Sequence, residues 1–188
     1  MKLSEYASIR TGLPLSRKET LPEKSHYKYN ALSLKNVLES GYILLSEILP
    51  YYASEELKKE YFTHFGDVIL RLSVPYTAIL ITEKETNLLV PSHFAIIRTN
   101  KTVDPRYLHW WLIKNRKSLY KNASGGTMMG TISSGYIEEM SFKPPPLEKQ
   151  RKLAELFSLA NREQQLLSLL WARKKQLTDA VLEKILMN

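Results

Sequence analysis

Residues 144–188 read PPPLEKQRKLAELFSLANREQQLLSLLWARKKQLTDAVLEKILMN, and this stretch decides the architecture. After its three prolines it contains neither proline nor glycine, and the residues that lose least conformational freedom in a helix dominate it. Proline is tolerated at the start of a helix but not inside one. The sequence therefore predicts one continuous helix from Leu147 to Asn188, roughly 60 Å long at about 1.5 Å per residue.

The apolar residues of this helix recur at a period close to 3.5, which is typical of a coiled-coil stripe. So long a helix with so narrow a stripe cannot wrap around the small remaining domain, so we favour pairing with a second long helix. The alternative is a broken pair of helices that pack on their own domain. The predicted contact positions are Leu153, Phe157, Ala160, Leu167, Leu170, Trp171, Leu177, Val181 and Ile185.

The composition leaves room for one domain of residues 1–146 and the helical appendage. The absence of cysteine excludes disulfides and thiolate metal sites, and it fits a cytoplasmic protein. Residues 1–10 lack the apolar run of a signal peptide, and no stretch approaches the roughly 18 apolar residues of a membrane span. We therefore expect a cytoplasmic protein without a membrane anchor.

The net charge of +8 points to a polyanionic partner, nucleic acid first and a membrane surface second. The excess is spread along the chain. Residues 1–146 carry 19 Lys and Arg against 14 Asp and Glu, and residues 147–188 carry 8 against 5.

Residues 1–146 predict an α+β domain, with a mixed β-sheet and short helices. Asp104 and Pro105 begin a predicted helix over 106–115, because Asp is a good N-cap and proline suits the first helical turn. Residues 37–52 are predicted to be irregular, and 54–61 to be a charged surface turn. The predicted strands are 27–34, 67–73, 77–82, 88–91, 94–99 and 139–143.

No motif of a catalytic site is present. Asp67 is not followed by the Glu-x-Lys of metal-dependent nucleases, and the four histidines show no ligand-like spacing. We therefore expect neither a metal nor a cofactor. The glycine-rich segment 124–135 fits neither the dinucleotide-binding signature nor the P-loop signature. Its backbone could approach a phosphate at Gly125, Gly126 and Thr127, or it could be an ordinary connection, and both interpretations stay open.

Several short motifs, in this order, resemble one half of a type I restriction-modification specificity subunit. They are LSEYASIRTG at 3–12, GDVIL at 66–70, DPRYL at 104–108, GGT and GTIS at 125–133, and FKPPPLEKQ at 142–150. The resemblance implies a non-catalytic DNA target recognition domain followed by a spacer helix. In that family two such units read the two halves of a split target. Their helices pair antiparallel and offer a platform for modification subunits.

This chain has one such unit, so the resemblance predicts either a half-subunit that forms homodimers or a fragment of a longer protein; the starting Met1 slightly favours the former. It implies double-stranded DNA, a methyltransferase subunit and a restriction subunit as partners. Basic residues are the natural contacts for phosphates. The candidates for DNA contact are Arg17, Lys18, Lys24, Lys28, Arg71, Arg116, Lys117, Lys121, Gly125, Gly126 and Thr127.

Two other functions compete with this one. A stand-alone nuclease or methyltransferase is disfavoured by the missing carboxylate–lysine cluster and the missing cofactor loop. A structural coiled-coil adaptor, with incidental positive charge, would bind no DNA even at low salt.

Overall fold

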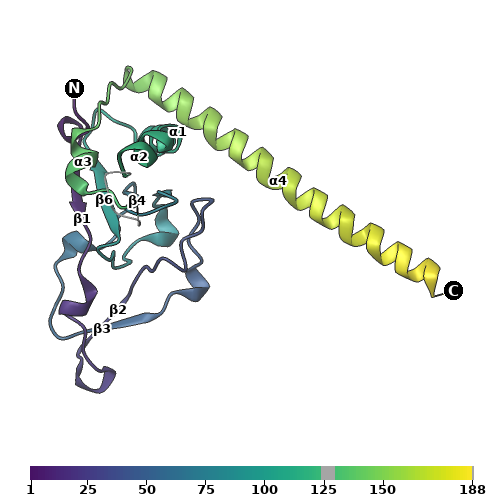
Figure 1. The fold of residues 1–188 in the computed structure, drawn as a ribbon, viewed down its shortest axis with the longest axis horizontal. Helices are drawn as coiled ribbons and strands as arrows, with labels where there is room; N and C mark the ends of the chain where they lie inside the picture. The colour runs from purple at the N-terminus through teal and green to yellow at the C-terminus, as the bar shows by residue number, and fades with distance from the viewer. Residues whose placement is uncertain (124–129, 188) are drawn as a thin grey trace.

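A four-stranded antiparallel sheet, in the order β1-β6-β4-β5, forms the centre of the structure. The computed structural model describes residues 1–123 and 130–187. Beside this sheet, β2 and β3 form a separate antiparallel pair at the end of the domain away from α1 and α2 (Figure 1). The strands are β1 (Ala7–Thr11), β2 (Tyr27–Asn30), β3 (Pro50–Ala53), β4 (Val68–Arg71), β5 (Ala78–Leu80) and β6 (Phe94–Thr99).

In the part of the chain that the structure describes, four α-helices follow β6, and short 3-10 helices lie in the loops before it. The α-helices are α1 (Pro105–Lys114), α2 (Arg116–Ala123), α3 (Ser134–Glu139) and α4 (Leu147–Leu186). The 3-10 helices are Leu3–Glu5, Leu15–Arg17, Pro22–Lys24, Leu45–Glu47, Lys59–Tyr61 and Glu83–Glu85.

The central strands β4 and β6 are apolar on both faces because both faces are covered. Val68 and Ile97 belong to the cluster that α1 covers with Tyr107 and Leu108. Ile69 packs on the opposite face, in a cluster that includes residues of the 32–48 segment. The α+β class is confirmed. All paired strands run antiparallel, and parallel pairing occurs in the isolated bridges Leu13↔Pro91 and Ala31↔Leu89.

The predicted start of α1 is confirmed: Asp104 caps the helix by accepting a hydrogen bond from the backbone N–H of Arg106 at 2.9 Å. Three other local predictions were wrong. Residues 139–143 form no strand, because α3 ends at Glu139 after an N-cap by Ser133. Residues 88–91 make isolated bridges instead of a strand, and β3 begins inside the segment predicted to be irregular.

The predicted long helix is confirmed as one uninterrupted element, α4, which leaves the domain like a rod (Figure 1). Its first turns pack against α1, with Ala154 buried and Leu153 against the core. Beyond Gln165 every described residue of α4 is exposed. No helix in the described part of the chain is both long and apolar enough to cross a membrane.

One buried side chain fixes the direction of this rod. Gln150 is 1% exposed, and its amide oxygen accepts a hydrogen bond from the backbone N–H of Asp104 at 2.9 Å. Its amide nitrogen donates to the carbonyl oxygens of Thr102, at 3.0 Å, and Pro145, at 2.8 Å. All three bonds reach backbone atoms, so the first turn of α4 is tied both to the proline tract and to the start of α1.

Candidate nucleic-acid interface

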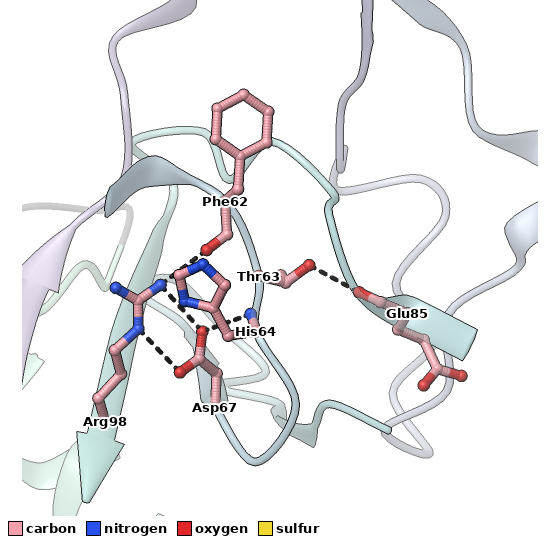
Figure 2. Close-up of polar contacts among 6 residues, drawn as sticks. All are labelled: Phe62, Thr63, His64, Asp67, Glu85 and Arg98. Atoms are coloured by element: carbon pink, nitrogen blue, oxygen red, sulfur yellow. Dashed lines mark hydrogen bonds and ion pairs between the residues drawn. The ribbon is translucent and has the colours of Figure 1, made fainter. Parts of the chain in front are cut away.

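The motif at Gly66 and Asp67 builds a rigid turn at the start of β4. The Asp67 carboxylate faces the guanidinium of Arg98 on β6 at 2.9 and 3.1 Å, and it accepts a hydrogen bond from the backbone N–H of His64 at 2.8 Å (Figure 2). Arg98 also donates to the carbonyl oxygen of Phe62 at 2.7 Å. Gly66 has a φ of +83°, which favours glycine. Asp67 therefore has a structural task in this turn.

Two other motif residues, Gly12 and Asp104, are also explained by their local structure. A Cβ on Gly12 would lie 2.3 Å from the carbonyl oxygens of Val90 and Pro91, so only glycine fits there. Burial opposes ionisation of Asp104, but hydrogen bonds from Arg106 outweigh it and lower the pKa of this carboxyl. These motif residues stabilise the fold, and the candidates for DNA contact lie elsewhere.

The first group of candidates, the distal group, consists of Arg17, Lys18, Lys24 and Lys28. It belongs to the end of the domain that holds β2 and β3 (Figure 1). Lys28 lies opposite Tyr52 in the strand pair, and the backbone N–H of Ser54 donates to the carbonyl of Lys18 at 2.8 Å. Arg17, Lys24 and Lys28 are exposed, whereas Lys18 pairs with Glu55. This end of the domain therefore presents exposed positive charge well away from the first turns of α4.

The second group, the α2 group, consists of Arg71, Arg116, Lys117 and Lys121. The α2 helix packs on the turn after β4, where the rings of Tyr76 and Tyr120 lie 4.9 Å apart. Arg71 ends β4, and its Nε donates to the Ser73 hydroxyl at 3.1 Å. Lys117 and Lys121 are exposed, whereas Arg116 lines a cavity beside α4. The structure therefore divides the predicted contacts into two groups on different parts of the domain.

Gly125, Gly126 and Thr127 lie outside the described residues. The described chain resumes at Gly130, whose carbonyl oxygen accepts a hydrogen bond from the Tyr76 hydroxyl. Thr131 then forms an isolated bridge with Ser73, and the backbone N–H of Ile132 donates to the carbonyl of Leu72 at 2.8 Å. The end of the glycine-rich segment thus returns beside Arg71 of the α2 group.

Among the described residues, ion pairs distinguish basic side chains that hold the fold together from those that form no ion pair, a distinction the sequence could not make. Arg98 pairs with Asp67, as described above. Lys2, Arg10 and Arg106 pair with Glu139, Glu60 and Asp104. Beside Lys28, His26 and Tyr27 are exposed as well, although the sequence analysis did not include them among the candidates. Their signal was a polar, aromatic strand at the surface, a pattern that also fits a plain edge strand.

The predicted contact positions on α4 fall into two sets. Leu153 packs against the core of its own domain, and the Phe157 ring lies 6.1 Å from the His109 ring. The other seven are exposed, which leaves them available for a partner: Ala160, Leu167, Leu170, Trp171, Leu177, Val181 and Ile185. Further leucines face outward on a neighbouring side of the helix, about 100° away by helical geometry. They are Leu159 and Leu166, 62% and 49% exposed, whereas Leu156 lies two heptads before Leu170 and so shares its side of the helix.

A groove runs between α4, α1 and the 39–43 loop. Two adjoining cavities of about 390 and 590 Å³ form it, and α4 lines it from Ala154 to Ser168. Tyr42 and Ile113 lie on the opposite wall, as does Thr77, which is 4% exposed and whose hydroxyl has no partner among the described residues. Burial lowers the pKa of the His109 imidazole, which lines the groove and contacts the Ala78 carbonyl at 3.2 Å.

No three His, Asp or Glu side chains gather into a potential metal site within residues 1–123 and 130–187. The geometry thus consists of two basic groups, a rigidly anchored rod and an open groove.

Comparisons with known proteins agree on the fold. No protein-family model matches the chain. Among solved structures, a chain from a study of complex assembly and conformational transition in a type I restriction-modification system matches with a TM-score of 0.65. That match has 17% identity and covers 90% of this chain and 43% of the other.

Two further structures match in the same way. The HsdS subunit of Thermoanaerobacter tengcongensis gives a TM-score of 0.59 at 16% identity, over 87% of this chain and 37% of that one. The type I restriction-modification S subunit of M. genitalium gives 0.52 at 14% identity, over 93% and 42%. The chain therefore spans about two-fifths of each of these proteins, and it has the fold of type I specificity subunits.

Proposed function

We propose that this chain is the non-catalytic DNA-specificity subunit of a type I restriction-modification system. It would recognise one half of a bipartite target and direct a methyltransferase and restriction complex to it. The observation that carries the proposal is the combination of one α+β domain with one anchored helix, which matches type I S subunits over about nine-tenths of the chain. The proposal places the protein in the cytoplasm, with the DNA.

DNA contact is assigned to the exposed basic residues of the two groups. Arg17, Lys24 and Lys28 project from the distal end, and Lys117 and Lys121 from α2. Contacts of this kind to phosphates hold a protein on DNA in any sequence. The bases themselves would be read by polar side chains of the neighbouring loops through the grooves.

Pairing of α4 with a second α4 would place two readers at the two ends of an antiparallel rod. The seven exposed contact positions support this, because so much apolar surface on an isolated helix favours association. Two identical readers related by a two-fold axis recognise an inverted repeat with an unread spacer. If the chain is part of a longer protein, the second helix comes from another segment, and the two half-targets differ.

Leu159 and Leu166 support a separate surface for the methyltransferase subunit. They lie about a quarter turn away from the pairing stripe, so one partner helix cannot cover both faces. We assign this second stripe to the modification subunit.

The test is to purify the chain together with a candidate modification methyltransferase and supply S-adenosylmethionine and random-sequence DNA. We expect methylation at inverted repeats of one sequence and one spacer length, and none when either protein is omitted. Methylation or cleavage by the chain alone would overturn the proposal in favour of an enzyme. An absence of any DNA binding at low salt, with the methyltransferase present, would overturn it in favour of a structural adaptor.

A further inference from the structure

The stripe on α4 contains polar residues at fixed places, and these places are informative. Successive positions of the stripe are separated alternately by four and three residues, which is the heptad spacing of a coiled coil. The residues are Leu153, Phe157, Ala160, Gln164, Leu167, Trp171, Lys174, Thr178, Val181 and Ile185. The polar members Gln164, Lys174 and Thr178 would weaken the stripe unless each meets a suitable neighbour.

We propose that two copies of this chain pair antiparallel in one register, in which facing residues have numbers that add up to 338. The inference rests on the proposed pairing of α4 and adds its register and the place where each helix ends. The centre of the pair is residue 169. The facing residues are then Leu153 with Ile185, Phe157 with Val181, Ala160 with Thr178, Gln164 with Lys174, and Leu167 with Trp171.

In this register most polar residues face polar residues, and the large apolar residues face one another. Gln164 meets Lys174 twice, once on each side of the centre, and Glu163 stands next to Gln164 where it can reach the same lysine. The small Ala160 meets Thr178, and the large apolar residues meet one another. Polar pairs of this kind weaken a coiled coil slightly and fix its register.

A shift of the register by one heptad, in either direction, places polar residues against apolar ones. One slip places Gln164 against Leu167 and Lys174 against Phe157. The other places Gln164 against Val181 and Lys174 against Trp171. Each leaves polar groups facing apolar side chains in a desolvated seam, which is costly. Among these three registers, the sequence complements itself best in the one centred on residue 169.

The groove gives the end of the partner helix a seat. Residues 173–184 of the second copy face residues 154–165, which are the part of α4 that lines the groove. The second copy's Leu182 then lies beside Ala154, on the flank that faces Ile113 and Tyr42. Its Lys174 and Thr178 pass the wall that holds the Thr77 hydroxyl, which has no hydrogen-bond partner among the described residues. The partner helix thus fills the angle between α4 and the domain.

Distances between spin labels test the register, because the chain contains no cysteine of its own. Glu155→Cys and Glu183→Cys are a matched pair: both residues are exposed glutamates on the outer side of the helix, and their numbers add up to 338. Double electron–electron resonance on each labelled variant should give the same distance, with an axial separation of about 42 Å. Leu169→Cys, at the centre, should give the shortest distance.

Each alternative has its own signature. A slip of one heptad makes the distances at 155 and 183 differ by about 21 Å, and a parallel pair gives equal, short distances at all three positions. Either result, or a lack of dipolar coupling in a sample at high protein concentration, would overturn the proposal.

Two variants test what sets the register and the seat. Gln164→Leu with Lys174→Leu should keep the dimer but add slipped registers to the distance distribution at 155, and an unchanged distribution would refute the role of the polar layers. Leu182→Asp should weaken dimerisation at least about tenfold, whereas Leu159→Asp, on the side away from the groove, should leave it unchanged. Equal effects would refute the seat.

These measurements need neither DNA nor methyltransferase, so the register and the proposed function can fail separately. Site-specific methylation together with unequal distances would overturn the register alone. Equal distances without any methylation would leave the register standing and overturn the function.

Discussion

The guanidinium of Arg98 binds the Asp67 carboxylate through two hydrogen bonds: Nε is 2.9 Å from one oxygen and Nη2 is 3.1 Å from the other. The Asp67 side chain is 4% exposed and that of Arg98 26%, so the pair is largely shielded from water. It joins the start of β4 to the end of β6, through the turn that carries His64 (Figure 2).

Removing one partner of this pair should be costly. Arg98→Met leaves the Asp67 carboxylate buried without its counter-ion, so we expect the free energy of unfolding to fall by roughly 3 kcal/mol in urea titrations. Arg10→Met removes the exposed pair with Glu60 and should change the free energy of unfolding far less, because water screens that pair. Similar losses in both variants would show that burial does not set the strength of the Arg98 pair.

Gln150→Leu should loosen α4 from the domain. The change deletes three hydrogen bonds and leaves the N–H of Asp104 and two carbonyl groups without their partner. Because each buried unsatisfied group costs about 1–3 kcal/mol, we expect destabilisation of at least about 2 kcal/mol and faster amide hydrogen exchange at 102–104. Gln176→Leu, the same change on an exposed turn of α4, should leave both quantities unchanged.

Neutralising the distal group should reduce the salt dependence of DNA binding. Each phosphate contact contributes about 0.9 to the slope of log K against log salt, so Arg17→Gln, Lys24→Gln and Lys28→Gln together should lower the slope by up to about 2.7. Fluorescence anisotropy with a labelled duplex measures the slope. Lys84→Gln with Lys101→Gln, two exposed lysines outside both groups, is the matched control. An unchanged slope in the triple variant would remove this group from the interface.

Charge placed in the pairing stripe should produce monomers. Leu167→Asp with Leu170→Asp puts two carboxylates into a seam that pairing would desolvate, so sedimentation should report the monomer mass. Leu159→Asp with Leu166→Asp, on the second stripe, should keep the dimer mass but abolish co-purification of the methyltransferase. A dimer that survives the first pair of changes would exclude this interface.

Lowering the pH should destabilise the folded state through protonation of His109. Burial lowers the pKa of this imidazole below its ordinary value of 6.5, so between the two pKa values the unfolded chain binds more protons than the folded one. The stability that His109 contributes is therefore complete above about pH 6.5 and is lost as the pH falls below it. The melting temperature of His109→Gln should change less between about pH 7.5 and pH 5.5 than that of the parent.

The sequence predicted the features that depend on local pattern. Leu147 begins a helix because a long run without proline or glycine follows three prolines, and Asp104 begins another because it caps. The helix α3 escaped prediction, because a six-residue helix that contains Gly135 has too weak a pattern. The strand β3 escaped because its proline and its neighbours look like a loop.

The candidate site was harder to predict, because DNA contact requires basic side chains that are not already held in ion pairs within the domain. Lys18 and Lys28 look alike in the sequence, yet the first pairs with Glu55 and the second is exposed on β2. Phe157 fits the pairing stripe by spacing, yet it also lies near His109 of its own domain. Contacts between distant segments decide these cases, and one sequence does not contain them.

The buried amide of Gln150 sets the angle at which α4 leaves the domain. It sits in the first turn of a rod roughly 60 Å long, so a tilt of about 10° at this residue moves the far end by about 10 Å. At 3.4 Å per base pair, that displacement corresponds to about three base pairs of DNA. The distance between two half-targets would therefore be read with an accuracy set by three hydrogen bonds at the base of the helix.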